Sequence, residues 1–203
     1  MATQGKVNAG HWAAPALEPK RSHRFVLLLN TVPAYVIKKV SKPNFTVAET
    51  PHKFMNWTFW YPGKVEWDAV TFTLVDPVRP NAALALLEAL KAGGYHYPNE
   101  GQENNTEMTV SKFRSTQALG SVKIQQLASS RSGTKAEVKE NADQIVEEWE
   151  LKNAWIQKVQ YGELNYDNDA LVETTVTLRY DWATMNQGSA AKWANNSDKG
   201  AAN

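Results

Sequence analysis

The chain has 203 residues, with 22 Lys or Arg against 21 Asp or Glu, and it contains no cysteine. This length fits one domain with terminal extensions, and the lack of cysteine excludes disulfides, thiolate zinc sites and cysteine nucleophiles. The near balance of charge excludes the strong basic field that is typical of a dedicated nucleic-acid binder. We find no apolar signal-peptide core and no apolar run of membrane-spanning length, so we expect a soluble protein made in the cytosol.

The two ends of the chain differ from the middle in composition. Residues 1–22 are rich in Ala, Gly, Pro and Lys without periodicity, which predicts an N-terminal arm. Residues 184–203 are small, polar and patternless apart from Trp193, which predicts a flexible C-terminal tail. Residues 23–183 are then expected to form a single domain.

The pattern between these ends predicts mostly β-strands. Phe25–Asn30 is a short apolar run, as expected of a strand that is buried on both faces. Val65–Val75 alternates between apolar residues and threonines, which predicts a half-buried strand. Further strands are predicted over Ala34–Val40, Ser121–Leu127, Gln144–Lys152, Ala154–Tyr161 and Leu171–Trp182.

The alternation in Leu171–Trp182 assigns its side chains to two faces. We expect one set to point inward: Val172, Thr174, Val176, Leu178, Tyr180 and Trp182. The polar set on the opposite face consists of Glu173, Thr175, Thr177, Arg179 and Asp181.

One helix is predicted, over Asn81–Ala92. Asn81 is a favourable N-cap, leucines repeat along one side, and Gly93-Gly94 ends the helix. Residues 99–105 and 128–143 are polar and predict long loops. Many strands with one helix predict a mainly β fold, an antiparallel two-sheet β-barrel or sandwich with one flanking α-helix.

The sequence carries no motif that is typical of an enzyme or a metal site. It has no phosphate-binding loop and no GxGxxG, HExxH or GxSxG pattern, and its four histidines are scattered. Asp167-Asn168-Asp169 lacks the glycine and the final glutamate of a calcium loop, which favours a polar turn. We therefore expect no catalytic residue, metal, cofactor or small-molecule substrate, and we do not expect an enzyme.

An acidic strip lies on the predicted strand Gln144–Lys152. Adjacent residues of a strand point to opposite faces, so Glu148 and Glu150 share one face while Glu147 lies on the other. This arrangement favours a solvated or lumen-facing acidic strip over a pair of catalytic carboxylates.

Aromatic side chains are concentrated in one short stretch of the chain. Trp57, Phe59, Trp60 and Tyr61 lie close together and are followed by Trp67. One strand cannot bury all of them in its own domain, because alternate residues face opposite sides. The stretch is either a strand buried on both faces or an exposed apolar surface that binds a partner. Few basic residues lie nearby to support base stacking, and aromatic residues are typical of protein interfaces, so we favour the partner-binding interpretation.

Three segments in a fixed order form a pattern more specific than any single motif. Tyr61–Pro77 has a Pro-Gly turn and then a strand opened by Trp-Asp, and Ala118–Leu127 contains a mid-chain strand. Val146–Ala183 contains the patterns E-W-x-L-x-N-A, Y-G-x-L-x-Y and L-x-Y-D-W-A. Together these segments resemble the tail tube proteins of contractile-tailed, myovirus-type bacteriophages, over residues 23–183. The resemblance extends to the tube proteins of type VI secretion systems and phage-like bacteriocins.

The resemblance implies a subunit that forms hexameric rings, which stack into the inner tail tube inside a contractile sheath. Double-stranded DNA would pass through this tube into the host without specific binding. The implied partners are further copies of the chain, the tail sheath protein, and the tape measure, baseplate and tail terminator proteins. The implied location is the virion tail tube, assembled in the host cytoplasm.

The resemblance and the strand pattern together select candidate residues. By position, residues 49–61 correspond to the family's extended hairpin that contacts neighbouring subunits. The subunit-interface candidates are Phe54, Trp57, Phe59, Trp60 and Tyr61. The lumen-facing candidates are Glu148, Glu150, Glu173, Thr175, Thr177, Arg179 and Asp181. A near-neutral lumen suits DNA passage, because a strongly basic wall would trap phosphates.

Two further functions fit the sequence. The first is the tube of a contractile injection system that passes protein effectors instead of DNA. The second is a monomeric β-barrel that binds a small ligand, in which the aromatic residues of Trp57–Trp67 would line the cavity.

Overall fold

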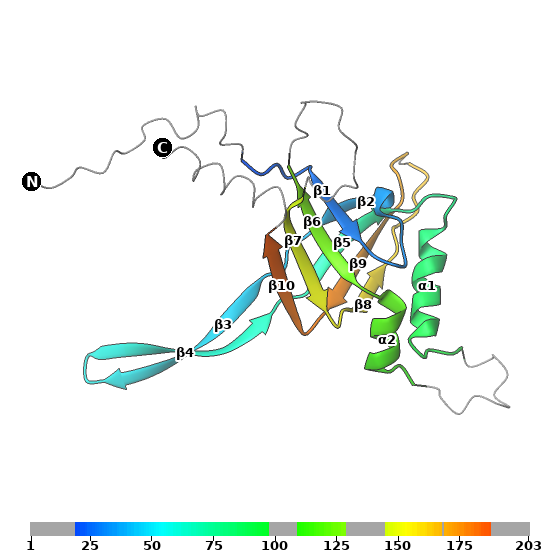
Figure 1. Cartoon of the computed structure of the whole chain (residues 1–203). Coiled ribbons are helices and arrows are strands. Elements are labelled where there is room, and N and C mark those ends of the chain that lie inside the picture. Colours follow the sequence, from blue (N-terminus) through cyan, green and yellow to red (C-terminus); the bar gives the residue numbers. More distant parts are fainter. Residues whose placement is uncertain (1–18, 98–108, 129–144, 168, 188–203) are drawn as a thin grey trace, which may run out of the picture.

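The computed structural model describes residues 19–97, 109–128, 145–167 and 169–187 (Figure 1). These residues form two four-stranded antiparallel sheets, a long two-stranded hairpin and two α-helices. Sheet A has the order β1 (Phe25–Leu28), β6 (Val122–Leu127), β7 (Ile145–Lys152), β10 (Trp182–Gln187). Sheet B has the order β2 (Ile37–Val40), β5 (Val70–Val75), β9 (Glu173–Arg179), β8 (Trp155–Gln160). The hairpin consists of β3 (Phe45–Phe54) and β4 (Trp57–Trp67), and a 3-10 helix η2 (Ala34–Val36) precedes β2.

The core is formed by the faces of the two sheets that point toward each other. In sheet B, Phe72 of β5 lies opposite Val176 of β9, and both side chains are buried. In sheet A, Leu27 of β1 lies opposite Ile124 of β6 and is also buried. The alternation of apolar and polar residues therefore places one face of each sheet inside and leaves the other face outside.

The two helices close the side of the molecule that lies away from the hairpin (Figure 1). They are α1 (Ala82–Ala92) and α2 (Lys112–Leu119). Asn81 caps α1, with its Oδ1 accepting a hydrogen bond of 2.8 Å from the Leu84 N–H. Leu86 of α1 and Leu119 of α2 are buried in the same core as the sheets. No helix in the described ranges is long and apolar enough to cross a membrane.

The mainly β, two-sheet antiparallel architecture with a flanking helix is the predicted fold class, which the structure confirms. The structure adds α2, which the sequence analysis did not predict because Lys112–Leu119 has only a weak apolar pattern. Ser111 caps this second helix, since its Oγ accepts a hydrogen bond of 3.3 Å from the Arg114 N–H. The start of the predicted strand Ala34–Val40 is wrong, because Ala34–Val36 forms η2.

Two predicted strands are interrupted in the structure. Val65–Val75 divides into the end of β4 and the whole of β5, with a break at residues 68–69. Leu171–Trp182 contains β9, a turn at residues 180–181, and then the start of β10. Trp182 begins a strand of the other sheet and is 47% exposed, so its predicted inward position is wrong. Val172 precedes β9 and is exposed, so its inward position is wrong as well.

The predicted tail boundary also needs correction. Residues 184–187 belong to β10, where Thr184 pairs with Glu150 of β7, so the folded domain extends past residue 183. The remainder of the predicted tail, most of the predicted arm, and most of the predicted loops at 99–105 and 128–143 lie outside the described residues.

Candidate subunit interface

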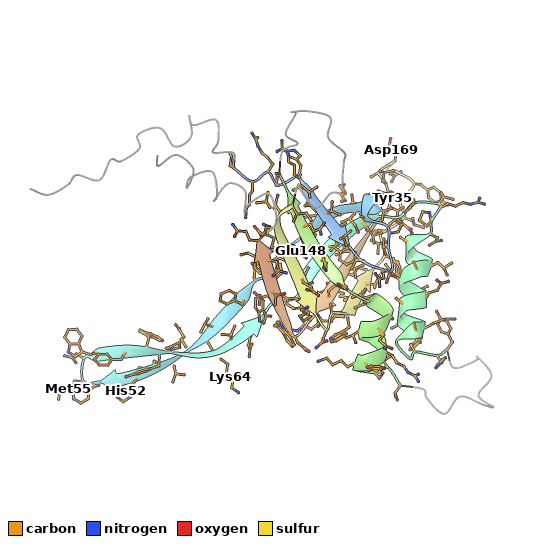
Figure 2. The ribbon with its side chains drawn as sticks, viewed as in Figure 1. Tyr35, His52, Met55, Lys64, Glu148 and Asp169 are labelled. Carbon is orange, nitrogen blue, oxygen red and sulfur yellow. The ribbon has the colours of Figure 1, made fainter. Side chains whose placement is uncertain are left out.

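The hairpin projects far away from the two sheets (Figures 1 and 2). Its strands have 10 and 11 residues, and at about 3.3 Å per residue each is roughly 30 Å long. The strands are joined at Met55 and Asn56, where Met55 has a left-handed φ of 51°. Hydrogen bonds from Ser41 to Thr71 and from Asp68 to Asn44, both 2.9 Å, join this hairpin to the β2–β5 pair. The hairpin is therefore an extension of sheet B.

The aromatic side chains of the hairpin are exposed to solvent. Their exposed fractions are 57% for Phe54, 69% for Trp57, 49% for Phe59, 59% for Trp60 and 57% for Tyr61. The structure thus places all five interface candidates on the hairpin as exposed side chains, and does not bury this strand on both faces. Scattered apolar residues are ordinary on protein surfaces, but a continuous group of this kind is typical of an interaction site. The identity of the partner stays a prediction.

The register divides the five candidates between two faces. Directly opposite residues of an antiparallel pair lie on the same face, and successive pairs alternate. Face 1 carries the pairs Phe54–Trp57, His52–Phe59 and Thr50–Tyr61. Face 2 carries the pairs Lys53–Thr58, Pro51–Trp60 and Glu49–Pro62. Four candidates therefore lie on face 1, and Trp60 is the only one of the five on face 2.

Met55 at the tip of the hairpin was not selected by sequence reasoning, although it is exposed together with the aromatic residues. The signal that could have found it is the Met55-Asn56 pair between two aromatic strands, because asparagine is favoured in tight turns.

The root of the hairpin is anchored to the body by aromatic rings that meet at steep angles. The Trp67 ring lies 5.4 Å from the Phe45 ring and 6.1 Å from the Tyr180 ring, measured between centroids. Tyr180 is buried, and burial raises the pKa of its hydroxyl to about 12. A β-bulge follows at Val47, where a Cβ on Gly63 would lie 3.0 Å from the Ala48 carbonyl oxygen. Glycine therefore allows the close approach of the two strands beside the bulge.

The structure does not bring the lumen-facing candidates together. Glu148 and Glu150 lie on the outer face of sheet A, where they form ion pairs of 3.3 Å with Lys123 and 2.7 Å with Lys152 respectively. The lysine partner is the main reason why the pKa of Glu150 is lowered.

A second group of lumen candidates lies on the outer face of sheet B. It consists of Glu173, Thr175, Thr177 and Arg179, all on β9. Asp181 belongs to neither group, because it lies in the turn after β9 and accepts hydrogen bonds from Lys112 and Asn153. These bonds lower the pKa of Asp181.

Glu147 is a buried carboxylate that sequence reasoning passed over. It points inward from sheet A, accepts hydrogen bonds from Lys20 and the Trp149 Nε1–H, and lies 2.8 Å from the Lys42 Nζ. Burial would raise the pKa of Glu147, but these three hydrogen bonds outweigh burial and lower it to about 2. Its charge therefore ties the segment before β1 and the linker before β3 to sheet A.

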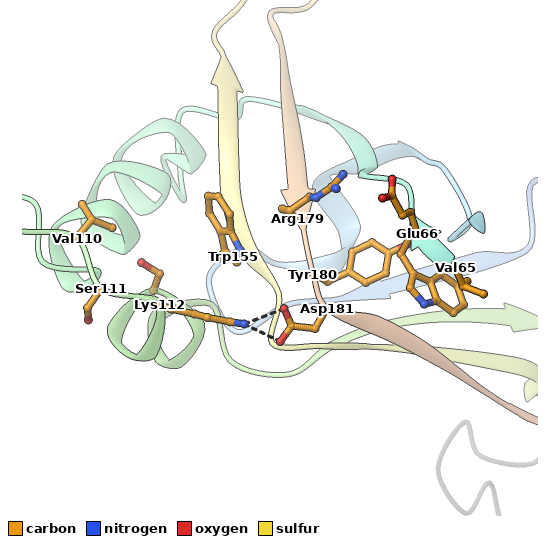
Figure 3. Close-up of a pocket in the computed structure, with 11 residues that line it drawn as sticks. Val65, Glu66, Val110, Ser111, Lys112, Trp155, Arg179, Tyr180 and Asp181 are labelled. Carbon is orange, nitrogen blue, oxygen red and sulfur yellow. Dashed lines mark hydrogen bonds and ion pairs between the residues drawn. The ribbon is translucent and has the colours of Figure 1, made fainter. Parts of the chain in front are cut away.

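A cleft of about 720 Å³ lies between α2, β8 and the root of the hairpin (Figure 3). Its wall includes Trp155, Arg179 and Tyr180, and Lys112 donates hydrogen bonds of 2.8 and 2.7 Å to the two Asp181 carboxylate oxygens. A ligand-binding barrel would need the aromatics of Trp57–Trp67 in its cavity, but of these only Trp67 is part of this wall, and those at positions 57–61 are not. Within the described ranges, no three His, Asp or Glu side chains gather as a possible metal site.

The comparisons with known proteins identify the fold. No family model and no curated protein matches the chain. Among solved structures, a chain of the six-fold symmetrised anti-feeding prophage (AFP) baseplate has a TM-score of 0.54 at 18% identity, covering 84% of this chain and 97% of that one. A chain of the extended sheath–tube complex of PVC, an extracellular contractile injection system, has a TM-score of 0.52 at 16% identity, covering 85% and 95%.

A chain of the AFP tube-terminating cap has a TM-score of 0.53 at 18% identity, covering 84% of this chain and 92% of that one. These likenesses extend over nearly the full length of the compared chains. The protein therefore has the fold of chains found in contractile injection particles, which is the relationship that its three sequence segments predict.

Proposed function

We propose that this protein is a structural subunit that forms hexameric rings, and that the rings stack into the inner tube of a contractile particle. The observation that carries the proposal is the hairpin, whose aromatic side chains are exposed on both faces. Obligate interfaces resemble a protein core cut in half and often exceed roughly 2,000 Å². Neighbouring copies of the chain would cover these side chains, and the fold shared with chains of a sheath–tube complex and a tube cap supports this role.

The edge strands favour a ring. Sheet A ends in β1 and β10, and sheet B ends in β2 and β8. Every pair of neighbouring strands is antiparallel, so the two edges of each four-stranded sheet run in opposite directions. Joining one edge to the opposite edge of a second copy would make another antiparallel pair. Such a head-to-tail contact can close into a ring and hide strands that would otherwise aggregate.

The remaining partners follow from a position inside a contractile particle. We propose that a sheath protein surrounds the tube, and that tape measure, baseplate and terminator proteins meet it along its length and at its ends. In a phage tail the passenger is double-stranded DNA, which passes without specific binding, and the location is the virion. The role of the chain is mechanical and not catalytic.

A tube that passes protein effectors is the second candidate function. It is favoured by the compared chains, which come from the anti-feeding prophage and from an extracellular contractile injection system. Purified particles treated with external nuclease and protease would distinguish the two functions. Protected DNA would support the phage tail, and protected protein without DNA would support the injection system.

Negative-stain electron microscopy of the purified protein, with light scattering on the same sample, tests the proposed function. Rings or hollow tubes with sixfold views are expected. A homogeneous monomer over a wide concentration range, which also fails to extend purified tube ends, would contradict the proposal. A monomeric ligand-binding barrel would then be the better explanation.

A further inference from the structure

Apart from Asp181, the lumen-facing candidates lie on the outer faces of two different sheets, and these faces point away from each other across the core. A wall one subunit thick can present only one of them to its channel. We propose that the outer face of sheet B lines the channel, and that the outer face of sheet A points outward to the protein layer around the tube. This inference rests on the proposed function and assigns the two sides of its wall.

The middle of the sheet B face is neutral and consists of short side chains. Thr71 lies opposite Thr177, and Thr73 lies opposite Thr175, so four threonines form a block across β5 and β9. Hydroxyl groups keep such a wall wetted without offering apolar contacts or trapping charged groups. A passenger can therefore move past this block without being bound.

The cations of the sheet B face lie at its margins. Lys39 is on edge strand β2, Lys158 is on edge strand β8, and Arg179 is at the end of β9. Lys38, also on β2, forms an ion pair with Glu173 at the start of β9. In a ring, the residues of edge strands lie at the joints between subunits, where side chains of a neighbouring copy face them. The charge thus flanks the neutral threonine block, with Lys39 opposite Thr73 and Lys158 opposite Thr177.

The outer face of sheet A has the chemistry of a protein contact. Leu28 on edge strand β1 is 38% exposed and Trp182 on edge strand β10 is 47% exposed, so in a ring both lie beside the joints between subunits. Between them lie the ion pairs that Glu148 and Glu150 form with lysines. Exposed apolar groups beside paired charges are typical of protein interfaces, whereas in a channel they would hold back the passenger. A surrounding protein layer is the occupant that fits this face.

The absence of cysteine from the natural sequence permits a direct test with single-cysteine variants. Thr175→Cys reports on the outer face of sheet B, and Thr184→Cys is a matched substitution on the outer face of sheet A, with both threonines half-buried. Gln125→Cys adds a central position on sheet A, in case a neighbouring copy covers β10. Each variant is labelled, as free subunit and as assembled tube, with a maleimide carried on a protein too large to enter the channel.

We expect assembly to slow the labelling of Thr175→Cys by about tenfold or more, because thiol reaction requires access of the reagent. Gln125→Cys or Thr184→Cys should keep the labelling rate of the free subunit. The assignment is overturned if Thr175→Cys stays reactive in tubes. It is also overturned if both sheet A positions become protected together with Thr175→Cys. Failure of the unsubstituted protein to form tubes would instead contradict the proposed function, and the assignment with it.

Discussion

Glu147 holds three segments together through a single carboxylate. Lys20 precedes β1, Lys42 lies between β2 and β3, and Trp149 is on the same strand as Glu147. The cleft that Lys42 and Trp149 line is also lined by other polar groups, those of Ser22, His23, Lys38, Lys39, Gln125 and Gln126. Gln126 is already engaged, because its Nε2 donates hydrogen bonds to the carbonyl oxygens of Arg21 and Arg24. A negative charge at position 147 thus fixes both the chain that enters sheet A and the linker that leads to the hairpin.

Stability should depend on the ionisation of Glu147. Its pKa falls from 4.5 to about 2 on folding, so the charged carboxylate stabilises the folded state at every pH above 4.5. This contribution should decline as the pH falls from 4.5 to 2. We expect Glu147→Gln to cost about 1–3 kcal/mol at pH 7, because it removes hydrogen bonds to a charged group. Urea unfolding at a series of pH values should show this difference shrinking below pH 4.5.

Glu150→Gln is the matched control for this prediction. Glu150 lies on the same strand, on the outer face, and its partner Lys152 is half-exposed. Loss of the Glu150–Lys152 ion pair should change the free energy of unfolding by at most about 1 kcal/mol, as is usual for surface ion pairs. Equal effects of the two substitutions at pH 7 would show that Glu147 does not hold the segments together.

The hairpin is the element that carries the candidate interface, and its two faces are unequal. Face 1 presents Phe54, Trp57, Phe59 and Tyr61, whereas Trp60 on face 2 lies between prolines at positions 51 and 62. Large aromatic residues dominate the energy of most protein interfaces. We infer that face 1 makes the larger contact with a neighbouring copy.

Substitutions on the two faces should therefore affect assembly differently. Trp57→Ser is expected to weaken tube formation by a factor of about 30 or more in critical concentration, corresponding to roughly 2 kcal/mol for an interface anchor. Trp60→Ser should have a smaller effect. Pelleting assays over a concentration series would measure both. Thermal unfolding of the subunit should be unchanged in each variant, because both side chains are exposed in the single chain.

A larger defect from Trp60→Ser than from Trp57→Ser would assign the main contact to face 2. If neither variant changed the critical concentration, the hairpin aromatics would not be the subunit interface at all.

For single elements, the sequence correctly predicts the features that depend on a local residue pattern. It fails where contacts between distant parts of the chain determine where an element ends. The alternation in β5 and β9 is local, and it predicts the burial of Phe72 and Val176 correctly. The turn that ends β9 depends on Lys112 and Asn153, which bind Asp181 from other parts of the chain. No pattern near Asp181 could reveal these partners, so Trp182 was assigned to the wrong strand.

Some features of the candidate site could likewise be predicted from the sequence, and others could not. The excess of aromatic residues in one strand already implies that some are exposed. Their division between two faces follows from the pairing register of β3 with β4 and from the turn at Met55. Likewise, the polar strand faces were found from alternation, but only the order of strands places Glu148 and Thr175 on different sheets.

The whole molecule is a packed body with a projecting arm. The core lies between sheets A and B and beneath the helices, while the hairpin joins the body through the contact of Trp67 with Tyr180 and the hydrogen bonds that continue the β2–β5 pair. The body should consequently fold without the outer part of the hairpin. In a head-to-tail assembly, each subunit has a surface that donates its hairpin and a different surface that receives one.

Replacing residues 49–62 with a short Asn-Gly turn tests this separation. The shortened chain should keep the unfolding temperature of the full chain within a few degrees, because the removed residues add nothing to the core. It should form no tubes alone, but it keeps the receiving surface. Small amounts added to the full-length protein should therefore shorten the tubes seen by electron microscopy, since a growing end that gains a shortened subunit offers no hairpin to the next ring. Tubes of unchanged length and number, with the shortened chain excluded from them, would show that the hairpin is not the element that joins one copy to the next.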